Sequence, residues 1–553
     1  MITGLLFRDS IISAANNISN SRQAVDALNV FPVPDGDTGT NMSMTITAAA
    51  KEMAALDDNC TVEEASAKCA SALLRGARGN SGVILSLIFR GFSKGFRGLT
   101  SAGAKDLANA FKDGVDAAYK AVMKPTEGTI LTVIRKASEA AQKAAETQDD
   151  PFEVGLAALT AAKEALAKTP ELLPVLKKAG VVDAGGQGLV LIFEGIESVW
   201  RNGVIVQPLD GSGVNPVSMP SKATVAAASD DIEFGYCSEF LIEKSSDAKE
   251  KDPLKLRAYL ESIGDCVVVV DDSSIIKVHV HSNCPGNVIQ AGLKYGQLIN
   301  IKIDNMRYQH ANADVGVKEG EKVVEPEITK PENEYGFVAV CAGEGLEELF
   351  SDIGADTIVS GGQTMNPSTD DILNAIMKTP AKVVFVLTNN KNIIMAAEQA
   401  APLAKDRDVR VLPTKTIPQG ISAMLMFDET ASADENQMNM LSAAENVETA
   451  QVTFAARDSE VDGKPIKQGE IMGLCNGKIK YIGDDITDIA VKAAHKLFKK
   501  GEHSLITIIY GEGASEDDAE AVEKALYEKY GSDVEISIVN GGQPIYYFII
   551  SVE

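Results

Sequence analysis

The chain has 553 residues, of which 45% are hydrophobic and 24% charged, and its formal net charge is -26. This length exceeds what one hydrophobic core supports, so three to four domains are expected. The acidic balance argues against a nucleic-acid partner, which requires basic patches. Seven cysteines, an odd number, give no disulfide framework. The sequence shows no apolar run of membrane-spanning length and no basic signal-peptide segment, so we expect a cytoplasmic protein without a membrane span.

Residues 1–205 are expected to form an all-α domain. Alanine-rich stretches such as 62–77 and 104–123 carry apolar residues at three- and four-residue spacing. This spacing is typical of helices that bury one face. Short segments of Gly, Pro and Asp separate the stretches, which predicts a helical bundle whose loops gather at its ends.

The rest of the chain divides into a middle and a C-terminal domain. Residues 206–222, rich in Gly, Pro and Ser, are interpreted as a linker. Over 223–316 the hydrophobic period becomes two, and "CVVVVDDSSIIKVHVHS" predicts two strands around a turn, so an α+β domain is expected. A second, charged linker is expected at 317–334. From 335 to 553 strands alternate with helices, which predicts an α/β domain with a mainly parallel sheet.

One loop in the helical region carries two carboxylates at a helix entrance. In "NVFPVPDGDTGTNM", Asp35 and Asp37 are separated by a single glycine. They are hard oxygen ligands, which Mg²⁺ accepts when phosphates complete its shell. An EF-hand is excluded, because Thr40 stands where that motif requires glycine. The alternative is an ordinary Asp-Gly turn, with Thr40 or Asn41 capping the helix.

Three further loops with glycines and polar residues lead into expected helices: "RGARGNSGVILSLIFRGF" at 75–92, "KPTEGTILTVIR" at 124–135 and "GVVDAGGQGL" at 180–189. In the first of them, the N–H groups and hydroxyl of Gly79, Asn80, Ser81 and Gly82 could hold an anion at a helix N-terminus. The Walker A pattern GxxxxGK[ST] occurs nowhere in the chain. At one end of a bundle, the four loops could form a nucleotide cradle without a sheet. The alternative is four ordinary helix connections.

These four motifs resemble the nucleotide-binding domain of the ATP subunit of dihydroxyacetone kinases, over about residues 1–200. The resemblance implies an antiparallel barrel of eight helices that binds ATP and two Mg²⁺ ions at one end. Asp35 and Asp37 match the metal aspartates of that family, whereas Val30 stands where those kinases have a third one. The resemblance further implies that nucleotide contacts come from Thr38, Thr40, Asn41, Gly79, Asn80, Ser81, Thr129, Asp183 and Gly185.

The segments "SGGQTMNPSTDDI", "TNNKNIIMAAEQA" and "LPTKTIPQGISAML" resemble the C-terminal region of the ATP-binding subunit of bacterial fatty-acid kinases. The resemblance to that family extends over essentially the whole chain. It implies transfer of the ATP γ-phosphate to the carboxylate of a fatty acid, which a separate lipid-carrier protein holds. It also implies a DegV-like C-terminal domain that docks the carrier, and a homodimer.

A possible zinc site is predicted in the middle domain. His279 and His281 are two residues apart on an expected strand, so both belong to one face. Cys237 lies on another expected strand. Imidazole and thiolate are zinc ligands, but three are one short of a closed structural site. Coincidental spacing is the alternative; resemblance to the central domain of the family favours zinc.

Phosphoryl transfer to a carboxylate, the reaction that the resemblance implies, requires few catalytic groups from the protein. The acceptor carboxylate is ionised near neutral pH, so no strong general base is required. The protein and its metal then have to supply only charge neutralisation and in-line positioning of the γ-phosphate. Arg78, beside Gly79, is a candidate to steady the transferring phosphoryl group. The alternatives are a kinase for a small hydroxy compound such as dihydroxyacetone, and a non-catalytic ATP-dependent scaffold.

Overall fold

The structure is a computed structural model. It describes residues 1–29, 37–122, 124–209, 236–244, 253–271, 275–305, 329–362, 365–461, 464–531 and 534–553. The chain forms two compact units. The first comprises Met1–Val217 and Pro326–Glu553, and the second comprises Ser218–Glu325. The N-terminal helices and the C-terminal α/β part therefore belong to one compact unit. No helix among the described residues is both long and apolar enough to cross a bilayer.

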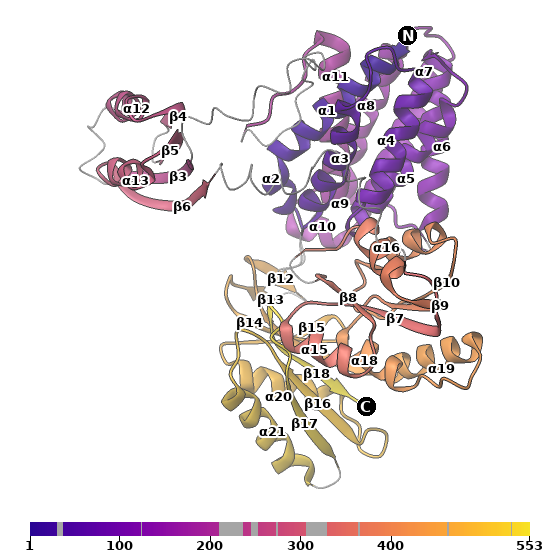
Figure 1. Cartoon of the computed structure of the whole chain (residues 1–553), viewed down its shortest axis with the longest axis vertical. Helices are drawn as coiled ribbons and strands as arrows, with labels where there is room; N and C mark the ends of the chain where they lie inside the picture. Colours follow the sequence, from indigo (N-terminus) through magenta and orange to yellow (C-terminus); the bar gives the residue numbers. More distant parts are fainter. Residues whose placement is uncertain are drawn as a thin grey trace. The chain divides into compact units, whose positions relative to one another are not determined.

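Within the described part of residues 1–209, eight long helices form the N-terminal domain (Figure 1): α1 Gly4–Asn20, α3 Thr38–Ala54, α4 Val62–Gly76, α5 Gly79–Gly95, α6 Ala104–Ala121, α7 Ile130–Ala144, α8 Pro151–Ala167 and α11 Ala184–Asn202. Shorter elements lie between them: β1 Ile2–Thr3, α2 Arg22–Asp26, β2 Ser101–Ala102, α9 Thr169–Leu172 and α10 Pro174–Ala179. Each long helix packs against the next, and α11 packs against α1, which closes a ring.

The helices begin where local capping chemistry allows it. Thr61 and Glu64 form a capping box at α4, in which Thr61 Oγ1 accepts from the Glu64 amide at 3.1 Å. The Glu64 carboxylate accepts in return from the Thr61 amide at 2.8 Å. Pro151 opens α8, where a missing N–H costs nothing. These short-range signals explain why the expected helices form at these positions.

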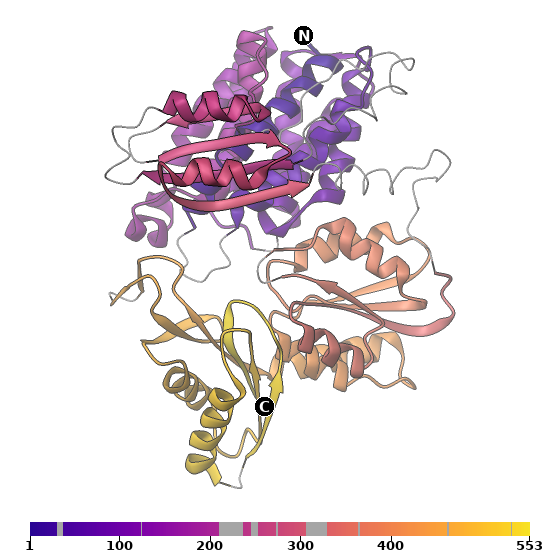
Figure 2. The same ribbon diagram turned by 60° about the vertical axis from the view of Figure 1, so that its left-hand side comes forward.

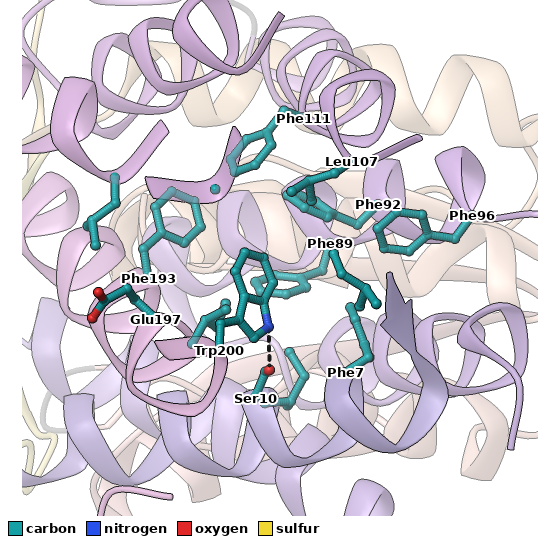
Figure 3. Close-up of a pocket in the computed structure, with 15 residues that line it drawn as sticks. Phe7, Ser10, Phe89, Phe92, Phe96, Leu107, Phe111, Phe193, Glu197 and Trp200 are labelled. Carbon is teal, nitrogen blue, oxygen red and sulfur yellow. Dashed lines mark hydrogen bonds between the residues drawn. The ribbon is translucent and has the colours of Figure 1, made fainter. Parts of the chain in front are cut away.

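One region of the ring interior is a packed apolar core around a small cavity of about 40 Å³. Phenylalanines from several helices line it (Figure 3): Phe7, Phe89, Phe92, Phe96, Phe111 and Phe193. The rings of Phe92 and Phe111 pack edge to face, with their centroids 4.9 Å apart. The Trp200 indole N–H donates to Ser10 Oγ at 2.9 Å, which satisfies its polar group within this core.

The first C-terminal sheet is parallel, as the sequence predicts, with strand order β10-β9-β7-β8. Its elements are β7 Asn333–Cys341, α15 Glu344–Asp352, β8 Thr357–Ser360, α16 Thr369–Lys378, β9 Ala381–Leu387, α17 Ile394–Ala400, η3 Ala401–Leu403, β10 Asp408–Leu412, α18 Ile417–Leu425 and α19 Ala433–Asn446. The strand that comes first in the chain, β7, lies between β8 and β9. Helices α16 and α17 share a core with one face of the sheet, and α15, α18 and α19 with the other.

The second C-terminal sheet differs from the prediction of a mainly parallel sheet. Its six strands have the order β15-β14-β11-β18-β16-β17, and only β16 and β17 run parallel. Asn476 and Gly477, with φ of 48° and 74°, join β14 to β15 in a hairpin, and such a turn can join only antiparallel strands. The elements are β11 Glu448–Phe454, β12 Ser459–Val461, β13 Lys464–Ile466, β14 Ile471–Cys475, β15 Lys478–Gly483, α20 Ile486–Leu497, β16 Leu505–Tyr510, α21 Glu516–Tyr530, β17 Glu535–Asn540 and β18 Tyr546–Val552.

Among the described residues of the middle unit, a four-stranded antiparallel sheet of order β4-β5-β3-β6 is accompanied by helices α12 and α13 (Figure 2). Its elements are β3 Tyr236–Lys244, α12 Pro253–Glu261, β4 Gly264–Asp271, β5 Ile275–Ser282, α13 Pro285–Leu293 and β6 Gly296–Asn305. Strands β4 and β5 pair antiparallel, which confirms the two strands predicted from "CVVVVDDSSIIKVHVHS".

Candidate functional site

Four helix N-termini meet around a hollow of about 350 Å³ in the N-terminal domain. The helices that begin there are α3, α5, α7 and α11, and the ring makes them run in one direction. The described residues that line the hollow are Asn29, Asp37, Thr38, Asn41, Asn80, Ser81, Ile84, Thr129, Ile130, Asp183, Gly185, Lys391 and Asn392. The structure therefore brings together the four loops that the sequence singles out. Their positive dipole ends favour an anion.

The Asp37 carboxylate is held from two sides. Its Oδ1 accepts a hydrogen bond from Asn41 Nδ2 at 2.7 Å, and its Oδ2 accepts one from Asn366 Nδ2 at 2.7 Å. A carboxylate oxygen can accept more than one contact, so these two hydrogen bonds are compatible with coordination of a cation. The orientation of the carboxylate is set before any ligand binds. Asp35, the other predicted metal ligand, lies outside the described residues.

The N-terminus of α3 is occupied by a carboxylate that the sequence did not single out. Asp26 Oδ1 accepts from the amides of Gly39 at 2.7 Å and Thr40 at 3.1 Å. Thr40 Oγ1 donates to Asp26 Oδ2 at 2.8 Å. The hydroxyl predicted to contact a phosphate thus binds a protein carboxylate, and Thr40 is not among the residues that line the hollow. The two amides lie 13 and 14 residues from Asp26 in the sequence, so no local capping motif predicts these hydrogen bonds.

Asp183 caps two helices at once. Its Oδ2 accepts from the Gly186 amide of α11 at 2.7 Å, and its carboxylate also accepts from the backbone of Ile130 in α7. Burial raises the pKa of this carboxyl to about 6, and the two backbone hydrogen bonds oppose the rise. Thr129 Oγ1 accepts from the Leu131 amide of α7 at 3.4 Å. The amides at these helix starts are therefore already partly satisfied.

The start of α5 is different, because no side chain caps it within the described structure. Gly79 has φ 57°, and a Cβ there would lie 2.5 Å from Asn41 Nδ2, so this position requires glycine. The buried Asn80 Oδ1 has no hydrogen-bond partner among the described residues. Leaving such an atom unsatisfied costs roughly 1–3 kcal/mol. An uncapped helix start and an orphaned oxygen, beside the Asp37 carboxylate, fit phosphates accompanied by hydrated Mg²⁺.

Arg78 lies differently from the sequence expectation. Its Nη1 donates to the Asn366 carbonyl at 2.8 Å, and its Nη2 lies 3.3 Å from an Asp371 carboxylate oxygen. Its backbone pairs with Ser368 in an isolated bridge. Arg78 does not line the hollow of Asp37 and Asp183. This placement fits a structural link between α5 and the C-terminal domain better than contact with a transferring phosphoryl group.

In the middle unit, the strand register places Cys237 of β3 opposite His281 of β5, and His279 two residues earlier on β5. The side chains of these three residues lie outside the described part of the structure. Among the residues that are described, no group of three or more His, Cys, Asp or Glu is placed to hold a metal ion. The zinc site therefore stays a prediction.

Comparison with known proteins assigns families to all three parts of the chain. Residues 32–198 match the DAK2 domain, 233–313 the middle domain of FakA-like fatty acid kinase proteins, and 336–553 the C-terminal domain of the same proteins. Protein YloV of Bacillus subtilis is 43% identical over 555 residues, covering 100% of this chain and 99% of the relative. The chain belongs to the FakA-like family of fatty acid kinase proteins.

Another full-length member, the uncharacterized protein SH1689 of Staphylococcus haemolyticus, is 42% identical over 100% of this chain and 99% of its own. Among solved structures, dihydroxyacetone kinase of C. freundii has 16% identity and a TM-score of 0.29, covering 41% of this chain and 48% of that one. A DegV family protein of Corynebacterium glutamicum has 18% identity and a TM-score of 0.30, covering 40% and 95%. The family memberships make this a kinase-related chain.

Asp183→Asn is expected to stabilise the nucleotide-free protein near pH 7.5 but not near pH 4. The folded-state pKa of Asp183, about 6, lies above the ordinary aspartate value. Wild type therefore has a stabilising contribution below about pH 4 that is lost as the pH rises through 6. Asparagine avoids the buried charge but keeps an acceptor for only one of the two backbone amides, so the gain at pH 7.5 is expected to be smaller than the ~3 kcal/mol that corresponds to the pKa shift.

This difference is measured as the Tm of variant and wild type between pH 4 and pH 8. Asp149→Asn, an exposed aspartate beyond the other end of α7, is the matched control. Parallel Tm profiles for Asp183→Asn and wild type would contradict the assignment.

Proposed function

We propose that this chain is the ATP-binding catalytic subunit of a fatty-acid kinase. It transfers the ATP γ-phosphate to the carboxylate of a fatty acid held by a separate lipid-carrier protein, giving acyl phosphate and ADP. The observation that carries the proposal is the hollow in which four helix N-termini surround a fixed Asp37 carboxylate, in a chain whose family is kinase-related.

In this reaction a carboxylate oxygen attacks the γ-phosphorus and the bond to the β-phosphate oxygen breaks. No proton has to be removed, because the acceptor is already ionised. The residues of this chain bind and orient the nucleotide. Asp37, with Asp35, would hold Mg²⁺, and the uncapped amides at Asn80 and Ser81 would bind phosphate oxygens. Mg²⁺, when bound, neutralises charge on the phosphates.

The residues that line the hollow favour a carboxylate acceptor over a hydroxyl. A hydroxyl acceptor benefits from a general base within hydrogen-bond reach. Among the described residues around the hollow there is no histidine, and the carboxylates are those of Asp37 and Asp183. Asp183 is committed to two backbone amides, and Asp37 to two side-chain amides. A carboxylate acceptor needs no base, so it suits this set of residues.

The proposal is tested by ATP consumption of the purified chain with Mg²⁺, with and without a carrier protein loaded with fatty acid. We expect consumption only with the loaded carrier, together with acyl phosphate that hydroxylamine traps. Unloaded carrier and dihydroxyacetone are the control acceptors. Turnover with dihydroxyacetone would favour the small-hydroxyl kinase. ATP binding without turnover on any carrier would favour the scaffold.

A further inference from the structure

Two loops of the C-terminal domain meet the nucleotide hollow of the N-terminal domain. They follow β8 and β9, at the carboxyl edge of the parallel sheet, and their described residues are 361–362 with 365–368, and 388–392. In open α/β sheets, ligands bind at this edge, near the strand where the chain order reverses. That strand is β7 here, since β8 and β9 lie on its two sides. The carboxyl edge of this sheet, where a ligand is expected, therefore faces the hollow formed by the N-terminal helices.

The first loop contacts Asp37. Asn366, which is 4% exposed, donates from its side chain to Asp37 Oδ2 at 2.7 Å, and its carbonyl accepts from Arg78 at 2.8 Å. The next residues continue the contact, since the Thr369 amide donates to the Ala77 carbonyl at 3.0 Å. The side chain of Asn366 therefore acts on the candidate metal ligand, while its backbone holds the domains together.

The contact is supported on both sides of the hollow. Val83 and Leu87 of α5 are buried in one core with α16 and α17. On the side of α2, Arg457 donates to the Ala27 carbonyl at 2.8 Å. The apolar core that α5 shares with α16 and α17, together with the hydrogen bond of Arg457, holds the first loop in position beside Asp37.

The second loop is held by buried hydrogen bonds. Thr388 Oγ1 donates to the Thr414 carbonyl at 2.7 Å, and Asn389 Nδ2 donates to the Val340 carbonyl at 3.0 Å. Asn389 has φ 53°, and its Oδ1 accepts from Thr414 Oγ1 at 2.8 Å. The Asn390 side chain donates to the Gly362 carbonyl, which ties the second loop to the first. Lys391 and Asn392 follow at once and line the hollow.

The charge of Lys391 sets it apart from the other described residues that line the hollow. Among the described residues that line the hollow, it has the only positively charged side chain, whereas Asp37 and Asp183 are acidic. The triphosphate of ATP brings several negative charges into this hollow of a chain whose net charge is -26. A lysine that lines the hollow would offset part of this negative charge, in addition to the proposed Mg²⁺.

We infer that the C-terminal domain is part of the phosphotransfer site, with Asn366 as a positioning residue for Asp37 and Lys391 as a phosphate-binding residue. The inference rests on the proposed function for the identity of the nucleotide. It extends the role of this domain beyond carrier docking, because among the described residues the lysine that lines the hollow and one side-chain donor to Asp37, Asn366, both come from the C-terminal domain. Secondary contacts of this kind typically change metal affinity 10- to 100-fold.

The test measures binding of a non-hydrolysable ATP analogue to the full chain by calorimetry, with and without Mg²⁺. Asn366→Ala is expected to raise the Mg²⁺ concentration for half-maximal binding ~10- to 100-fold, and to leave Mg²⁺-free binding unchanged. Its backbone link to Arg78 persists in this variant. Lys391→Met is expected to weaken binding about tenfold with and without Mg²⁺, and Lys391→Arg to restore it, because the charge returns.

Matched controls come from the same domain. Lys382→Met is the control for Lys391→Met, and it changes a lysine near the amino end of β9, the strand that precedes Lys391. Asn374→Ala is the control for Asn366→Ala, and it changes an asparagine within α16. Both should bind like wild type, and the Tm of every variant confirms folding. Unchanged nucleotide affinity and Mg²⁺ dependence in Asn366→Ala and Lys391→Met would overturn the inference, as would equal losses in the controls. Because binding is measured without a carrier, failure of the kinase reaction in wild type would refute the proposed function separately.

Discussion

Asp37→Ala should lower the kcat of acyl-phosphate formation by on the order of 10³-fold or more, while the protein stays folded. The two amides that hold the carboxylate, on Asn41 and Asn366, would lose their acceptor, and the proposed Mg²⁺ would lose a ligand. Asp37→Asn should be nearly as damaging. Its amide has one oxygen and one NH₂, so one of the two donors would face another donor.

The measurement is kcat with loaded carrier across a Mg²⁺ titration, with circular dichroism as the folding check. Asp149→Asn, exposed and remote from the hollow, serves again as the control. From its spacing in the sequence, Asp35→Ala is expected to behave like Asp37→Ala. Near-normal turnover of Asp37→Ala at saturating and at limiting Mg²⁺ would rule out its role as a metal ligand.

The largest expected loss of stability comes from Gly91→Ala in α5. In most helices this substitution stabilises, by up to about 1 kcal/mol, because alanine restricts the unfolded chain. Here a Cβ would lie 2.1 Å from the backbone nitrogen of Gly114 in α6. The two helices would have to move apart, which opens the apolar core between them. We expect the free energy of unfolding to fall by about 2–4 kcal/mol.

Thermal unfolding measures this effect, and a Tm lower by roughly 5–15 °C is expected for a domain of this size. Gly286→Ala is the control, since Gly286 lies in α13 and a Cβ there would meet nothing within 4 Å. Its Tm should equal that of wild type or exceed it slightly. A Gly91→Ala variant as stable as the control would show that α5 and α6 approach less closely than the structure indicates.

Several features of the site followed from short stretches of sequence. The loops before α3, α5, α7 and α11 could be found because glycine, aspartate and threonine mark helix starts within a few residues. The parallel sheet followed from strands that alternate with helices, and the β4–β5 hairpin from a period of two. The Asn-Gly turn between β14 and β15 is an equally local signal, and it marks the antiparallel pairing that the α/β prediction missed.

Other features depend on residues that only the fold brings together. Asn366 meets Asp37 across 329 residues and Arg78 across 288, and the loop of Lys391 reaches the hollow from the other domain. Asp26, close in sequence, takes the amides of α3 because α2 packs against that helix. By itself the sequence determined the helix starts and their carboxylates, since capping and periodicity act over a few residues. Tertiary structure alone decided that Asn366 also holds Asp37, that Thr40 and Arg78 do not line the hollow, and that Lys391 does, because these depend on how whole elements pack.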